Sequence, residues 1–184
     1  MTKDDLIKDL SATLVKTKVD KLSRIVKDQR FNLRDLIDLT FYEDKNIAFR
    51  AAWVLENVYL VNPVFYLPDL DYLLARFKEV TNPSCQRHYT KIVRHITMPR
   101  TRPLIKQKLQ DTDLEPVVEK CFDALIDPKI PIAVKVFSTE VLFNLRNRYD
   151  WITEELTNQL HFMMRNGSPG IQTRGRKLLE ALKK

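Results

Sequence analysis

The sequence predicts an all-α chain built from about four stacked helix pairs. Glycine is scarce, and its three occurrences, Gly167, Gly170 and Gly175, lie near the C-terminus. Tight hairpins, phosphate-binding loops and dinucleotide sites depend on glycine, so we expect none of them in residues 1–166. Along the chain, a helix start signal recurs four times, and the same apolar spacing follows each one.

The start signal is a helix-capping residue placed before a long amphipathic segment. An Asp, Asn or Ser side chain can accept a hydrogen bond from an unpaired N–H of the first turn, and proline suits the next position. Three of the four caps precede a proline, and the caps lie 38, 45 and 41 residues apart. The caps are Asp44, Asn82, Asp127 and Ser168, and the prolines are Pro83, Pro128 and Pro169.

The apolar spacing follows each cap at positions +3, +7, +10 and +14, which fall on one face of a helix. The first cap gives Ile47, Ala51, Val54 and Val58, and the second gives Cys85, Tyr89, Ile92 and Ile96. Ile130, Val134, Phe137 and Val141 follow the third cap, and Ile171, Gly175, Leu178 and Leu182 follow the fourth. The shared register indicates a repeating unit.

A first helix precedes each of these second helices. We expect the first helices at residues 32–40, 69–80, 115–126 and 151–165, with Asn32 and Asp69 starting the first two. Residues 98–112 form a basic insertion between the second helix of one pair and the first helix of the next, and we expect a short extra helix at 104–109. Residues 1–31 are expected to form N-terminal capping helices, with the stripe Val15, Val19, Leu22 and Val26.

This unit resembles the HEAT/armadillo-like α-solenoids, whose period is about 40–47 residues. The segment from Asp44 to Ala52, with its aspartate, basic residue and small residues, is similar to the start of a second HEAT helix. The resemblance covers roughly residues 32–184 and implies a right-handed α-α superhelix. We therefore expect residues 1–184 to form a single repeat domain. A compact bundle is the alternative, because residues 130–145 are apolar nearly all round.

No apolar run approaches the length that spans a membrane, and the N-terminal segment lacks the apolar core of a signal peptide. We therefore expect no membrane contact and a cytoplasmic location. Cys85 and Cys121 lie in apolar patterns, which predicts buried thiols. We expect no cofactor.

Patterns of catalytic or metal-binding residues are not evident. His88 and His95 are seven residues apart, and His161 lies alone on an apolar helix, so none has the usual spacing of a metal pair. Adjacent carboxylates such as Asp4 and Asp5 lie at predicted helix starts, where negative charge is favourable. We therefore predict neither catalytic nor metal-binding residues, and an ordinary metabolic enzyme has no support beyond the length of the chain.

The basic tract at residues 84–110 is the main candidate for a binding surface. The tract carries seven of the chain's cations, and no acidic residue lies between Glu79 and Asp111. Arg87, Lys91 and Arg94 follow helical spacing, which predicts a ridge along one face of the helix. Arg174 and Lys177 of the last helix could lie on the same side of the array as this ridge. The predicted surface comprises Arg87, Lys91, Arg94, Arg100, Arg102, Lys106, Lys108, Arg174 and Lys177. A solvated helix face is the alternative explanation for the ridge.

Two aromatic features of the sequence each allow two structural interpretations. Trp53 either packs in the core or lies at the rim of a groove beside the ridge. The segment 63–68, bounded by prolines, is expected to be an apolar loop over the end of a helix pair, or else an exposed patch for a partner.

Two functions are consistent with these observations. The first is a non-enzymatic interaction module that binds a protein partner on the broad surface of stacked helices. The alternative is binding of nucleic acid through the tract, since concentrated positive charge attracts phosphates. Because some alkylpurine DNA glycosylases have HEAT-like folds, glycosylase activity is a minor branch of this alternative. It would need an acid in an aromatic-lined basic groove, and the sequence does not point to one.

Overall fold

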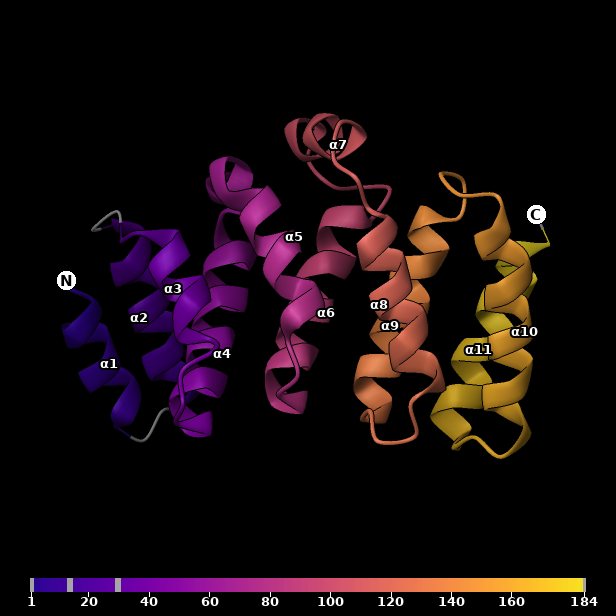
Figure 1. The fold of residues 1–184 in the computed structure, drawn as a ribbon, viewed down its shortest axis with the longest axis horizontal. Helices are drawn as coiled ribbons and strands as arrows, with labels where there is room; N and C mark the ends of the chain where they lie inside the picture. The colour runs from indigo at the N-terminus through magenta and orange to yellow at the C-terminus, as the bar shows by residue number, and fades with distance from the viewer. Residues whose placement is uncertain (1, 13–14, 29–30, 184) are drawn as a thin grey trace.

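The computed structural model describes residues 2–12, 15–28 and 31–183, and its helices stack side by side from one end of the molecule to the other (Figure 1). The α-helices are α1 (Lys3–Ser11), α2 (Lys16–Asp28), α3 (Leu33–Leu39), α4 (Lys45–Val61), α5 (Leu70–Glu79), α6 (Pro83–Thr97), α7 (Pro103–Gln110), α8 (Glu115–Ile126), α9 (Ile132–Leu145), α10 (Trp151–Arg165) and α11 (Pro169–Leu182). A 3₁₀ helix, η1 (Pro63–Asp69), lies between α4 and α5.

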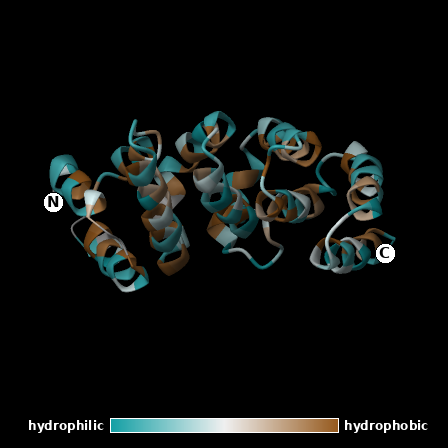
Figure 2. Cartoon of the chain, turned by 90° about the horizontal axis from the view of Figure 1, so that it is seen from below, coloured by the Kyte–Doolittle hydropathy of each residue, from teal (hydrophilic) through white to brown (hydrophobic). Residues whose placement is uncertain are grey.

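Four helix pairs make up most of the array: α3 with α4, α5 with α6, α8 with α9, and α10 with α11. Each second helix packs on the next second helix, so α4, α6, α9 and α11 form one row, and α2 packs against α4 at its end. Figure 2 shows two rows that arch, with the second helices on the inner side of the arch. The chain is therefore an extended helical solenoid, and the compact bundle is excluded.

Capping residues start the helices largely as the sequence predicts. The Asp44 side chain accepts hydrogen bonds from the backbone N–H groups of Asn46 and Ile47. Asn82 accepts one from Ser84, and Asn32 caps α3 in the same way. α11 also begins where predicted, although the Ser168 side chain makes no capping bond.

The prediction that Asp127 caps the second helix of the third pair is wrong. Residues 127–131 form a turn instead, in which Asp127 accepts hydrogen bonds from Lys129 and Ile130, and α9 begins at Ile132. Pro131 explains the delay. A helix begun at Pro128 would need the N–H of residue 131 to bond the carbonyl of Asp127, and proline has no N–H. It also disfavours helical backbone at the residue before it.

Two smaller expectations also need correction. Val15 is 54% exposed and precedes α2, whereas the other three residues of its stripe, Val19, Leu22 and Val26, are buried. The segment 63–68 is not an irregular loop, because it lies within the 3₁₀ helix η1, which packs against α4, α5 and α7. The short helix expected at 104–109 is present as α7.

One continuous core runs along the array, from Leu6 in α1 to Leu160 in α10. The predicted apolar stripes of α4 and α6 are fully part of it, and Tyr89 is its largest completely buried side chain. α9 is less enclosed than its composition predicts, since Ile132 is 48% exposed and Phe137 is partly exposed. No helix in the described ranges combines the length and the apolar character needed to cross a membrane.

Candidate binding face on the inner helices

The predicted ridge lies on α6, but two of its three cations are already paired. Arg87 is exposed, and the described part of the chain gives it no ion pair. Lys91 and Arg94 are partly buried and contact carboxylates from the neighbouring second helices, Glu56 of α4 and Glu140 of α9. The tract that is free of acids in sequence is therefore partly neutralised in space.

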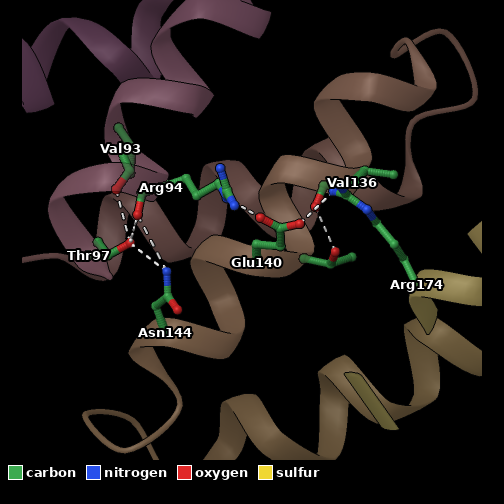
Figure 3. A network of polar contacts seen from close by, with 8 residues as sticks. Val93, Arg94, Thr97, Val136, Glu140, Asn144 and Arg174 are labelled. Carbon is green, nitrogen blue, oxygen red and sulfur yellow. Dashed lines mark hydrogen bonds and ion pairs between the residues drawn. The ribbon is translucent and has the colours of Figure 1, made fainter. Parts of the chain in front are cut away.

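Glu140 connects three second helices, as Figure 3 shows. One of its carboxylate oxygens accepts a bond from Nε of Arg94 on α6, and the other accepts a bond of 2.5 Å from Nη1 of Arg174 on α11. Nearby, Nδ2 of Asn144 donates to Oγ1 of Thr97 over 3.2 Å. Arg94 of α6 and Arg174 of α11 thus meet at one carboxylate. Lys177 is exposed on α11.

Glu56 is the most buried carboxylate of this face, with a side chain only 7% exposed. One oxygen lies 2.6 Å from Nδ1 of His88, and the other accepts a bond from Nζ of Lys91. Burial acts to raise the pKa of Glu56, but the hydrogen bonds and positive charge of these two partners outweigh it and lower the pKa. The group is therefore a fixed anion between two helices.

A hollow of about 500 Å³ opens beside this ion pair, between α4, α6 and the start of α9. Three aromatic side chains line it: Phe49, Trp53 and Phe137. The rings of Phe49 and Trp53 stack with centroids 6.0 Å apart. Trp53 packs against the core and also lines this hollow, so both of its expected environments apply. Arg87 provides the free positive charge of the hollow.

The cations of the basic insertion lie elsewhere. Arg100 and Arg102 are exposed and line a second hollow of about 360 Å³ at the C-terminal ends of α4 and α6, where His95 also lies. Burial, followed by the charges of Arg94 and Lys91, lowers the pKa of His95.

The remaining two predicted cations stand on α7, at the edge of the array (Figure 1). Lys106 is exposed there, and Nζ of Lys108 donates to Asp71 over 2.5 Å. The nine predicted residues therefore do not form one continuous patch.

Sequence reasoning missed the two acids that organise this face, Glu56 and Glu140. Each is the only carboxylate of its helix, and both helices are otherwise largely apolar. A buried acid on a long apolar helix needs a partner. The isolation of these two acids was therefore the sequence signal that could have identified them as sites of ion pairs.

The two cysteines are buried and their thiols are held in the protonated form. Burial raises the pKa of the Cys85 and Cys121 thiols to about 12, so both remain protonated near neutral pH. The described residues contain no group of three or more metal-ligating side chains. Of the expected capping acids, Asp5 forms a capping box with Thr2.

Comparison with known proteins gives one family match. The model of a HEAT repeat domain matches residues 6–182, nearly the whole chain. No curated protein and no solved structure matches this chain. The match begins in α1, so it includes the N-terminal helices as well as the four pairs described above. With its stacked helix pairs and this match, the chain belongs to the HEAT-repeat family.

Proposed function

We propose that this protein is a non-enzymatic interaction module that binds a protein partner on the inner face formed by α4, α6 and α9. The observation that carries the proposal is the hollow lined by Phe49, Trp53 and Phe137 beside the exposed Arg87. Aromatic side chains and arginine are enriched where protein interfaces concentrate their binding energy. HEAT repeats commonly present such extended surfaces to other proteins.

Nucleic-acid binding is the weaker candidate. A phosphate backbone is held by a series of free cations, because the release of its counterions drives binding. On α6, however, Lys91 and Arg94 are paired with buried or half-buried carboxylates, which also repel phosphate. Of the cations on this tract, Arg87, Arg100, Arg102 and Lys106 remain without an acidic partner in the described residues.

Glycosylase activity has a specific counterargument. Glu56 does lie in an aromatic-lined basic hollow, the setting such an enzyme needs. Both of its oxygens already contact groups of the chain, His88 and Lys91, which hold the carboxylate between two helices. This arrangement supports a structural role for Glu56.

Site-specific photocrosslinking in the native cell tests the proposal. A photoreactive amino acid is placed at the position of Ser84, an exposed residue that lines the hollow, and in a second variant at Glu119, an exposed residue of α8 in the outer row. Captured proteins are identified by mass spectrometry, and the protein captured from the inner position alone is purified. The affinity of this captured protein is then measured for the wild type, for Trp53→Ala and for Phe162→Ala. Phe162→Ala is the control, because it removes an exposed aromatic side chain of α10.

Trp53→Ala is expected to weaken binding at least about tenfold, because it removes an aromatic anchor of the interface. Phe162→Ala is expected to bind with the affinity of the wild type. Equal capture from both positions, or a Trp53 variant that binds like wild type, would refute the inner-face site. Recovery of nucleic acid in place of protein would favour the alternative function.

A further inference from the structure

The two hollows of the inner face lie on one seam between α4 and α6. On each helix the lining residues recur at intervals of three or four, which places them on a single helix face. On the α4 side they are Phe49, Trp53, Glu56, Tyr59 and Leu60, followed by Pro63. On the α6 side they are Pro83, Ser84, Arg87, His88, Lys91 and His95, followed by Met98. The two hollows therefore lie one after the other along the same α4–α6 seam, which is called the groove below.

Free positive charge is found at the two ends of this groove. Arg87 lines the hollow at the start of α6, and Arg100 and Arg102 line the hollow beyond its end. Lys91 lies between them and is neutralised by Glu56. Glu56 is also the one carboxylate among the described residues that line the two hollows. The groove thus has a neutral centre and two cationic ends.

The length of α6 sets the separation of these ends. Thr97, the last residue of α6, lies ten positions after Arg87, and at the rise of an α-helix these ten steps span about 15 Å. An extended chain advances about 3.3–3.6 Å per residue, so at least about five of its residues are needed to reach from one end to the other.

From this arrangement we infer that the occupant of the groove is an acidic, extended segment of the protein partner. Carboxylates separated by at least about five residues pair with Arg87 at one end and with Arg100 and Arg102 at the other. Apolar side chains between them cover Trp53 and Leu60, the latter 42% exposed. The inference rests on the proposed function and specifies the chemistry of the partner.

Charge complementarity favours this segment over a nucleic acid. Phosphates repeat at every nucleotide, so a strand along the groove would place negative charge beside the carboxylate of Glu56. A peptide can place its carboxylates at the two ends only and leave apolar residues at the centre, which matches the charge distribution of the groove.

Selection from a random twelve-residue peptide library displayed on phage tests the inference. The intact protein is the bait, and the enriched peptides are synthesised with a fluorescent label for affinity measurements. We expect enriched sequences with acidic residues separated by at least about five positions and apolar residues between them. Reversing charge in Arg87→Glu, or in the double variant Arg100→Glu/Arg102→Glu, is expected to weaken their binding at least about tenfold.

Lys106→Glu is the matched control for Arg87→Glu, because it reverses one charge at an exposed cation that lines neither hollow. It should retain binding within about twofold at moderate ionic strength. Enrichment of neutral or basic peptides, no enrichment at all, or equal losses in all three variants would overturn the inference. The partner captured from position 84 could still depend on Trp53 in that event, so the proposed function would stand. A labelled oligonucleotide that displaces the peptides through the same arginines would overturn both.

Discussion

Substitution of Glu56 by glutamine tests the view that this carboxylate is a fixed structural anion. The variant keeps the shape of the side chain and removes its charge, leaving His88 and Lys91 without their partner. Hydrogen bonds to charged groups contribute about 1.5–3 kcal/mol, and breaking a buried pair costs about 3–5 kcal/mol. The Lys91 side chain is 33% exposed and can turn to water, which lowers its share. We therefore expect Glu56→Gln to lower the free energy of unfolding by about 2 kcal/mol near neutral pH.

The effect should depend on pH in a defined direction. The pKa of Glu56 in the folded chain lies below its ordinary value of 4.5. Its charge therefore contributes stability above the unfolded-state pKa, and this contribution is lost as pH falls through the folded-state pKa. The difference between wild type and Glu56→Gln should shrink toward zero on acidification, because the protonated glutamate resembles the glutamine.

Urea unfolding followed by circular dichroism, repeated between about pH 7 and about pH 3, measures both expectations. Glu180→Gln is the matched control, since Glu180 is exposed on α11 without a partner in the described residues. Its effect should stay within about 0.5 kcal/mol. A stability loss in Glu56→Gln no larger than this control, or a loss that persists at acidic pH, would refute the reasoning.

Three further predictions concern the packing of the array. Glu140→Gln removes the shared partner of α6 and α11, so amide hydrogen exchange should accelerate in α11 first, and unchanged exchange there would contradict the bridging role. Asn82→Ala should destabilise the chain by about 1 kcal/mol in urea unfolding, whereas Ser168→Ala, at a cap without a side-chain bond, should be nearly neutral, and equal losses would contradict this. Cys85 and Cys121 should react with a thiol reagent only on unfolding, as judged by rates with and without urea, and rapid labelling of the native chain would contradict their burial.

Local signals predict most of the fold. Asp44 and Asn82 start α4 and α6 where expected, since a cap acts on N–H groups only two or three residues away. Asp127 shows the limit of such signals. It resembles the other caps, but Pro131 removes a hydrogen bond that the helix would need and moves the start of α9 to Ile132.

The candidate site was less accessible to sequence reasoning because its ion pairs cross between repeats. Lys91 meets a carboxylate 35 positions away in the chain, on the preceding second helix. The familiar i, i+4 spacing predicts pairs within one helix, whereas Glu56 and Glu140 reach their partners through the stacking of separate helices. Whether Arg87 has an acidic partner also depends on which side chains the stacked helices bring near it, and spacing within one helix does not show this.

The two tryptophans provide the most direct test of the inner-face site, because Trp53 lines the groove and Trp151 lies on α10 in the outer row. In a two-dimensional ¹H–¹⁵N spectrum each indole N–H gives one signal, and Trp53→Phe assigns them. The account predicts that adding the enriched acidic peptides shifts the Trp53 signal while the Trp151 signal stays in place. A shift of Trp151 alone, with Trp53 unmoved at saturation, would contradict it.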